Sequence, residues 1–163
     1  MDPVTASVYI GKPPEEVYAY LSDVAHHAEF MDHFLKDWHL TRRESAGVGA
    51  GARFRLEAPF VRFGWADAVI VEAAPHRIVL HGRGGKFNRI RQRTEYVLSP
   101  APGGTTKVET TVETVPALPS DRLLELFAGR RWFGRRLRHG LKRLRSILEE
   151  DRDRGARVTV AGG

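Results

Sequence analysis

The chain of 163 residues contains no cysteine. Disulfides, thiolate zinc sites, iron–sulfur clusters and cysteine nucleophiles are therefore excluded, and the fold must be stable through packing alone. No apolar run approaches the roughly 20 residues that are needed to cross a bilayer. Residues 1–10 also lack the basic flank and apolar centre of a signal peptide. We therefore expect a cytoplasmic protein without a targeting segment.

Acidic residues are fewer than basic ones, and the net charge is +6. Of the 26 basic residues, 21 are arginine, a bias that a GC-rich genome also produces without selection for charge. Composition alone therefore does not assign a nucleic-acid or membrane partner. The length suits one domain with one sizeable core. We expect that domain over residues 1–151 and a disordered tail over residues 152–163.

Periodicity along the chain predicts one strand, two short helices and then a series of strands. Residues 4–10 alternate as in a half-buried strand. Pro14 begins a helix, because proline fits the first turn and two glutamates follow it. Residues 24–34 form a second, shorter helix or a loop. About six strands joined by short turns follow between residues 38 and 115, which favours an antiparallel meander.

The last two of these strands, residues 90–98 and 106–115, have two different faces. One face carries arginine and glutamate side chains within cross-strand reach of one another, so we expect it to be solvated. The other face is apolar but includes hydroxyls and an amide, which a purely structural core tends to avoid. Four polar residues on this face are candidates for lining a ligand cavity: Gln92, Thr94, Tyr96 and Thr110. The alternative is a core in which local hydrogen bonds satisfy them.

A long helix is predicted from Ser120 to about Asp151, with Ser120 as its N-cap. Phe133 and four leucines recur along it at three- and four-residue intervals and form one apolar stripe. Gly134 and Gly140 lie on or beside the stripe, where each costs about 1 kcal/mol relative to alanine. We expect both glycines to face a cavity or the sheet.

The same helix carries eight basic residues between Arg130 and Arg145, with no acidic residue among them. Like charges at this density repel, so an acidic partner is one interpretation. Five of these residues fall on one side of the helix and would let it rest on an anionic membrane: Arg131, Arg135, Arg138, Lys142 and Arg145. The alternative is a solvated helix in an arginine-rich protein. RNA is the less favoured partner.

The order of elements and three short motifs resemble the START-related helix-grip superfamily. The motifs are Pro13-Pro14-Glu15-Glu16-Val17-Tyr18-Ala19-Tyr20-Leu21-Ser22-Asp23, Gly49-Ala50-Gly51-Ala52-Arg53-Phe54 and Val71-Glu72-Ala73-Ala74-Pro75-His76-Arg77. The superfamily includes Bet v 1-like allergens, polyketide cyclase/dehydrase-like proteins and coenzyme Q-binding lipid carriers, and the similarity covers roughly residues 4–150. It implies an α+β fold in which a curved antiparallel sheet of six to seven strands wraps around the C-terminal helix, with two short helices after the first strand closing a cavity.

The resemblance implies that the chain binds an apolar small molecule, such as a lipid, an isoprenoid or a polyketide, as a carrier or sensor. The alternative is a polyketide aromatase or cyclase acting in the same cavity without a metal or redox cofactor. Acid/base candidates for such an enzyme are Asp67, His81 and Tyr96, although strand parity does not fix the direction of Asp67 or His81.

Five further residues are candidates for contact with the ligand. Four of them are aromatic partners for the same space, with ordinary core packing as the alternative: Trp38, Phe54, Trp65 and Phe133. The fifth, Arg130, would neutralise an acidic ligand head at the cavity mouth, with a surface arginine as the alternative.

Two other patterns point to chemistry that we do not favour. His26, Glu29 and His33 have the spacing of metal ligands on one helical face, but a second set of ligands is missing from the sequence. The glycine-rich segments 47–51 and 82–86 do not lead from a strand into a helix, as phosphate-binding loops do. The sequence therefore predicts neither a metal site nor a cofactor.

Overall fold

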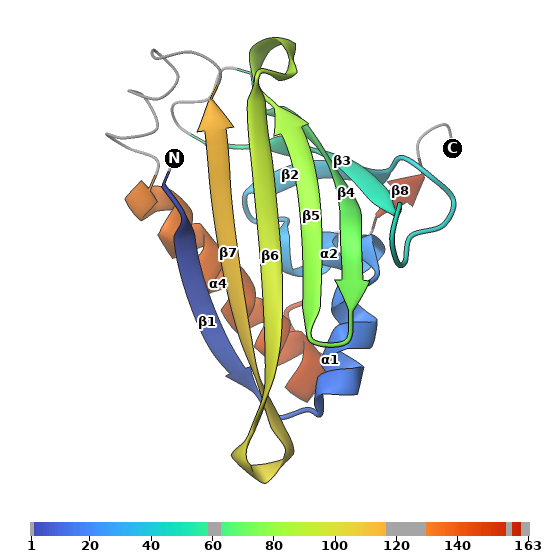
Figure 1. Ribbon diagram of the computed structural model, residues 1–163, viewed down its shortest axis with the longest axis vertical. Coiled ribbons are helices and arrows are strands. Elements are labelled where there is room, and N and C mark those ends of the chain that lie inside the picture. Colours follow the sequence, from blue (N-terminus) through green and yellow to red (C-terminus); the bar gives the residue numbers. More distant parts are fainter. Residues whose placement is uncertain (1, 59–62, 117–129, 156–157, 161–163) are drawn as a thin grey trace.

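The computed structural model describes residues 2–58, 63–116, 130–155 and 158–160 (Figure 1). Within them, one curved sheet packs against helices that stand behind it in the view of Figure 1. The elements are β1 (Val4–Ile10), α1 (Pro14–Leu21), α2 (Val24–Met31), β2 (Leu35–Leu40), β3 (Gly51–Leu56), β4 (Trp65–Ala74), β5 (Arg77–Gly84), β6 (Ile90–Ala101), β7 (Thr105–Pro116), α4 (Arg130–Glu150) and β8 (Thr159–Val160).

The strands form a single sheet in the order β1-β7-β6-β5-β4-β3-β2-β8. Strands β1 to β7 pair antiparallel, which confirms the predicted α+β fold, a curved antiparallel sheet of six to seven strands with a C-terminal helix. The two-residue strand β8 pairs parallel with β2 and is not foreseen by the sequence. It belongs to the segment 152–163, for which the sequence predicts a disordered tail. Within that segment, Thr159 and Val160 therefore pair with β2.

The two short helices form where local sequence favours them. Pro14 is the first residue of α1, and Glu15 and Glu16 lie in its first turn, where carboxylates interact well with the helix dipole. The side chain of Asp23 caps α2 by accepting a hydrogen bond from the backbone N–H of Ala25 at 2.9 Å. Residues 24–31 are thus a helix, which decides between the helix and the loop that the sequence left open.

The sheet has a concave face toward the helices and an outer face toward solvent. In the register of β6 and β7, Tyr96 lies opposite Thr110 on the concave face, and Arg93 lies opposite Glu113 on the outer face. The outer pair forms a salt bridge at 3.8 Å, while Tyr96 and Thr110 are buried. These strands therefore divide into the charged and apolar faces that their alternation predicts.

Small residues let the sheet curve between β3 and β6. Gly82 of β5 approaches β4 so closely that a Cβ at this position would lie 2.7 Å from the carbonyl oxygen of Asp67. The same row continues across the sheet with Ala68 of β4 and Ala52 of β3, and it ends at Gln92 of β6. Because these side chains are small, few side-chain atoms project from the concave face beside Gln92.

The C-terminal helix α4 packs its apolar stripe against β1 and α2. The stripe is buried at Leu137, Leu141 and Leu144, and also at Ile147. The sequence predicts that this helix begins at Ser120, but residues 120–129 lie outside the described part of the chain. None of the helices in the described residues is long and apolar enough to span a membrane.

The two glycines of α4 face different neighbours. A Cβ at Gly134 would lie 3.4 Å from Val4 of β1, so this glycine faces the sheet, as expected. A Cβ at Gly140 would lie 2.8 Å from the Met31 sulfur and 3.3 Å from the carbonyl oxygen of Phe30, both in α2. Gly140 therefore faces α2, and the expectation that it faces the cavity or the sheet is corrected. Its role is to let two helices approach closely.

Candidate ligand-binding site

A buried threonine hydroxyl of β7 lies on the concave face of the sheet. Thr110 is fully buried, and its Oγ1 has no hydrogen-bond partner among the residues that the structure describes. A polar group buried in this way costs roughly 1–3 kcal/mol, so structural cores avoid it. Its cross-strand neighbour Tyr96 is also buried, and burial raises the pKa of the Tyr96 phenol. Two neutral residues with hydroxyl groups are therefore register partners on this face.

A buried histidine approaches this pair from α2. The ring of His27 lies edge-on to the ring of Tyr96, with centroids 5.5 Å apart. Its Nε2 is 2.8 Å from the carbonyl oxygen of Leu21, which can only accept, so Nε2 carries the proton and Nδ1 keeps its lone pair. Burial lowers the pKa of His27 to about 4, so the ring is neutral at pH 7. Sequence reasoning did not select His27 as a ligand contact.

Aromatic rings bridge α2 and the sheet beside this histidine. The rings of Trp38 and Phe54 are stacked, with centroids 4.5 Å apart, and both residues are buried. Trp38 also lies 6.2 Å from the ring of His27. The four rings of Phe54, Trp38, His27 and Tyr96 therefore form one continuous layer. The structure places Trp38 and Phe54 on the concave side, where they fill the space between α2 and the sheet.

The concave face is more open farther along β6. Gln92 and Thr94 are half-buried, and the Gln92 amide donates a hydrogen bond to the Thr94 hydroxyl at 3.1 Å. Gln92 stands at the end of the row of small residues that continues through Gly82 and Ala68. A polar line of Gln92, Thr94 and Tyr96 therefore leads from a half-open region to the buried centre.

The remaining predicted ligand contacts lie apart from this set. Phe133 lies in the first turn of α4 and is half-buried, with its ring centroid 5.7 Å from that of Phe34. Arg130 is exposed at the start of α4. Trp65 is on the outer face, where it is 41 % exposed and lies 5.3 Å from the Arg53 guanidinium. Phe133 is thus the one of these three that is partly buried against the core.

The three acid/base candidates do not converge. Asp67 and His81 lie on the outer face, where Asp67 forms a salt bridge with Arg53 at 3.6 Å and His81 is exposed. Tyr96 lies on the concave face, on the other side of the sheet. Tyr96 therefore cannot act on one bound molecule together with Asp67 and His81. The buried neutral group that does meet Tyr96 is His27.

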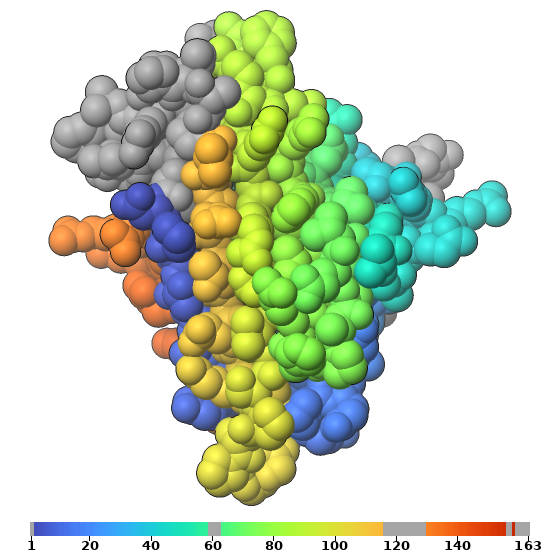
Figure 2. Space-filling model, in the orientation of Figure 1, coloured from blue at the N-terminus to red at the C-terminus, as the bar shows by residue number. Residues whose placement is uncertain are grey.

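A hollow of about 580 Å³ lies on the outer face rather than between the sheet and the helix. It spans β4 to β7 and is lined by Asp67, Val69, His81, Arg83, Arg91 and Val115, among others. Figure 2 views the molecule from this side. The sequence predicts a cavity of several hundred Å³ enclosed by the sheet and α4, so this position differs from the expected one. Aromatic rings of α2, β2 and β3 fill part of the space between the sheet and the helices.

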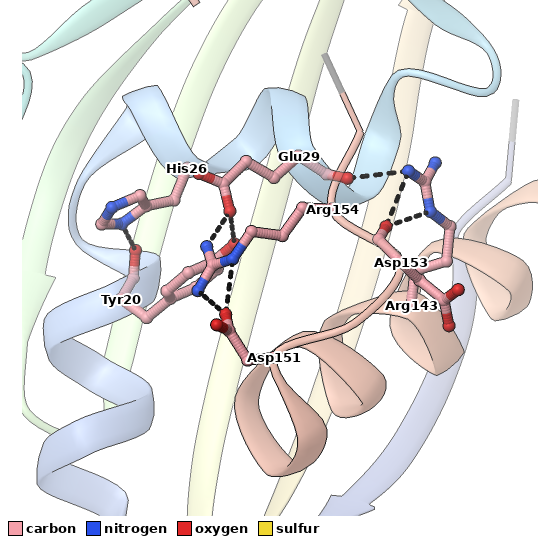
Figure 3. Close-up of polar contacts among 7 residues, drawn as sticks. All are labelled: Tyr20, His26, Glu29, Arg143, Asp151, Asp153 and Arg154. Carbon is pink, nitrogen blue, oxygen red and sulfur yellow. Dashed lines mark hydrogen bonds and ion pairs between the residues drawn. The ribbon is translucent and has the colours of Figure 1, made fainter. Parts of the chain in front are cut away.

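The histidine-rich segment of α2 serves as an anchor for the C-terminal segment (Figure 3). Glu29 accepts a hydrogen bond from the Tyr20 hydroxyl at 2.8 Å and forms an ion pair with Arg154. The His26 ring lies 3.1 Å from the Tyr20 carbonyl oxygen, and His33 contacts the Arg136 carbonyl oxygen at the same distance. The side chains with metal-ligand spacing are therefore engaged in contacts between elements.

Comparison with known proteins agrees with this geometry. The family model described as polyketide cyclase / dehydrase and lipid transport matches residues 1–149. The chain belongs to this family. The fold of polyketide cyclase / dehydrase and lipid transport proteins suggests a role in binding hydrophobic ligands. No curated protein matches the chain.

Solved structures of the same fold are distant in sequence. A crystal structure from Deinococcus radiodurans has 23 % identity and a TM-score of 0.60, and the match covers 92 % of this chain and 99 % of that one. A START superfamily protein from Mycobacterium smegmatis has 13 % identity and a TM-score of 0.63, with the same coverage of 92 % and 99 %. Norcoclaurine synthase from Thalictrum flavum, in complex with dopamine and hydroxybenzaldehyde, has 8 % identity and a TM-score of 0.61, covering 85 % and 84 %.

Proposed function

We propose that the protein carries or senses an apolar small molecule with a polar tip, bound against the concave face of the sheet. The observation that carries this proposal is the buried Thr110 hydroxyl, which has no partner among the described residues and belongs to the register partner of Tyr96. A polar tip that bonds to Thr110 would remove the cost of burying that hydroxyl. The apolar body of the ligand would lie along β6 toward the half-open region at Thr94 and Gln92.

The ligand class follows from the lining. Aromatic rings at Trp38, Phe54 and Tyr96 favour flat or hydrocarbon-rich molecules over charged ones. The family description supports lipids and polyketides, and norcoclaurine synthase, which shares the fold, was solved with dopamine and hydroxybenzaldehyde. We also place this activity in the cytoplasm, which fractionation of the host cell would check.

The experiment combines a retained ligand with a pair of blocking variants. Native mass spectrometry of protein purified from its own host is expected to show an added small mass that denaturation releases. Ala68→Phe places a large ring on the concave face next to Gln92, and Val69→Phe, one residue away, places it on the outer face. Ala68→Phe should abolish saturable binding of the neutral fluorescent probe N-phenyl-1-naphthylamine, and Val69→Phe should not. Thermal unfolding of both variants confirms that they are folded.

Two results would contradict the proposal. One is a chain mass without additions together with no saturable binding of the probe. The other is probe binding that survives Ala68→Phe and is lost in Val69→Phe, because it would locate the probe in the outer hollow, which Val69 lines.

A cyclase-type enzyme is the second candidate, and His27 is the observation that favours it. The neutral ring lies against Tyr96, and its Nδ1 lone pair can accept a hydrogen bond from a bound molecule. His27 and the Tyr96 phenol would then position a reactive polyketide chain. Incubation of the retained ligand with wild type, His27→Gln and Tyr96→Phe tests this, since an enzyme forms product at a rate that both variants lower. Unchanged ligand after prolonged incubation leaves the carrier.

We further propose that α4 rests on an anionic membrane while the ligand is exchanged. Arg131, Arg135, Arg138, Lys142 and Arg145 are all exposed, and only Arg145 of these five has an ion pair among the described residues, with Glu149 at 3.0 Å. Each basic residue near an anionic surface contributes about 1 kcal/mol. Cosedimentation with phosphatidylglycerol vesicles should therefore exceed that with phosphatidylcholine, and it should fall with salt and in the double variant Arg135→Gln/Arg138→Gln. Equal retention by both vesicle types would contradict docking.

A further inference from the structure

Two arginines face each other directly on the outer face of the sheet. Arg83 of β5 and Arg91 of β6 are register partners, and both are exposed. Like charges at directly opposite positions of antiparallel strands destabilise the pairing. Within the described residues, neither guanidinium forms an ion pair with a carboxylate. This position therefore holds two positive charges that no described side chain neutralises.

The carboxylates nearest to these arginines pair with other residues. Asp67 is the register partner of Arg83, but its carboxylate forms a salt bridge with Arg53 at 3.6 Å. Glu113 lies 3.8 Å from Arg93, which also bonds to Glu95 at 2.8 Å. Arg53 and Arg93 therefore have carboxylate partners on this face, whereas Arg83 and Arg91 have none among the described residues.

Both arginines line the outer hollow of about 580 Å³. That volume lies within the range of about 300–1,000 Å³ that small-molecule sites occupy. His81 and Asn88 offer further hydrogen-bonding groups around the hollow, and Val69 and Val115 offer apolar surface. Figure 2 shows this face of the molecule. A concave shape and an unbalanced charge therefore coincide at one place.

We propose that this hollow binds a phosphate group between Arg83 and Arg91. A phosphate offers three oxygens to two guanidinium groups, each of which can bond through two parallel N–H groups. Its negative charge removes the repulsion between the two arginines. Val69 and Val115 accommodate an apolar part of the same molecule. The phosphate belongs either to a soluble monoester or to a lipid headgroup, and the experiment separates these sources.

The first test follows thermal unfolding and amide NMR signals as inorganic phosphate replaces chloride at constant ionic strength. The wild type should gain in Tm, and the amides of Gly82 and Arg91 should shift saturably. Arg83→Gln/Arg91→Gln should weaken phosphate binding by at least about tenfold. Without phosphate, its Tm should equal or exceed that of the wild type because the repulsion is gone. The control variant Arg42→Gln/Arg43→Gln removes the same charge from the exposed segment between β2 and β3 and should keep the response.

The second test identifies the source of the phosphate. If it is soluble, glycerol 3-phosphate reproduces the NMR shifts, and Arg83→Gln/Arg91→Gln binds phosphatidic acid vesicles no less than the control variant does. If it is a headgroup, Arg83→Gln/Arg91→Gln loses cosedimentation with phosphatidic acid vesicles and keeps that with phosphatidylglycerol. An equal response to phosphate in wild type and Arg83→Gln/Arg91→Gln, or no saturable response in the wild type, overturns the proposal. Neither result bears on ligand binding at the concave face.

Discussion

Thr106 and Thr110 occupy the same face of β7 in opposite circumstances. Both are fully buried, but the Thr106 hydroxyl donates a hydrogen bond to the Lys12 carbonyl oxygen at 2.7 Å, whereas the Thr110 hydroxyl has no partner among the described residues. Thr106→Val should therefore lower the free energy of unfolding by about 1 kcal/mol. Thr110→Val should leave it unchanged or raise it, because a buried unpaired hydroxyl is removed. Urea denaturation measures both variants.

The same pair separates a ligand contact from a structural residue. Thr110→Val should also weaken binding of the retained ligand, while Thr106→Val should not. A loss of stability in Thr110→Val equal to that in Thr106→Val, with unchanged ligand affinity, would assign Thr110 to the core.

His27 should make the protein sensitive to acid. Burial holds its pKa at about 4, below the ordinary value of 6.5. Between these two pH values, His27 is therefore protonated in the unfolded chain and neutral in the folded protein. Stability is therefore complete above pH 6.5 and is lost as the pH falls toward 4, by roughly 3 kcal/mol for this group. His27→Gln should remove that part of the slope while keeping a donor for the Leu21 carbonyl oxygen. Urea denaturation between pH 4 and 7 tests this.

His81→Gln is the control for the loss of a histidine, since its side chain is exposed. His33 retains part of the slope in both variants, because burial lowers its pKa as well. An unchanged slope in His27→Gln would show that protonation of His27 does not oppose folding.

Sequence patterns locate some site residues and not others for a physical reason. Along β6 and β7 one face is strongly charged, so alternation places Tyr96 and Thr110 on the concave face. Along β4 both faces carry apolar residues, with Trp65 and Val69 on one and Ala68 on the other. The alternation of the sequence therefore does not show which face of β4 points toward the helices. Only the structure shows that the Asp67 side chain lies on the outer face.

His27 had a signal that sequence reasoning overlooked. In α2 the apolar stripe runs through Val24, Ala28 and Met31, and His27 falls on the same stripe at helical spacing. A histidine on an apolar stripe is buried, and therefore differs from its neighbours His26 and His33. The spacing of His26, Glu29 and His33 was considered for metal binding, and the helix face that His27 occupies was not considered.

At the scale of elements, the two glycines of α4 should respond oppositely to alanine. A Cβ at Gly134 would lie in ordinary contact with Val4 at 3.4 Å, so Gly134→Ala should raise the free energy of unfolding by up to about 1 kcal/mol through helix propensity. A Cβ at Gly140 would lie 2.8 Å from Met31 and press on the backbone of α2, so Gly140→Ala should lower it by about 1–2 kcal/mol. Thermal or urea unfolding distinguishes them, and a stabilising Gly140→Ala would contradict this account of how α4 packs on α2.

Most elements could be predicted because each satisfies a local rule. Pro14 and its glutamates mark α1, alternation marks β6 and β7, and the leucine stripe marks α4. Strand β8 could not be predicted, because two residues carry no periodicity and their pairing with β2 joins distant parts of the chain. Arg154 and Gly155, which precede β8, contact Glu29 of α2, and such contacts arise only in the tertiary structure.

At the scale of the whole molecule, Arg143 connects three parts of the chain (Figure 3). Its guanidinium forms an ion pair with Asp32, donates to the Glu29 carbonyl oxygen at 2.9 Å and donates to the Asp153 carbonyl oxygen at 3.0 Å. Its side chain is only 15 % exposed. Arg143→Met should therefore lower the free energy of unfolding by roughly 2 kcal/mol, since it leaves a carboxylate and two carbonyl groups without this donor.

Lys142→Met is the matched control, because Lys142 is the neighbouring cation and is exposed. It should change the free energy of unfolding by less than about 0.5 kcal/mol. Equal effects of the two substitutions in urea denaturation would show that the C-terminal segment contributes no stability through Arg143.

The central claim is that an apolar ligand binds to the concave face and not to the outer hollow. Valine methyl groups report on both sides, since Val108 and Val112 lie on the concave face and Val69 and Val115 line the outer hollow. Methyl NMR spectra during titration with N-phenyl-1-naphthylamine should show saturable shifts of Val108 and Val112, and nuclear Overhauser contacts from their methyl groups to the probe. Shifts and contacts confined to Val69 and Val115 would contradict the claim.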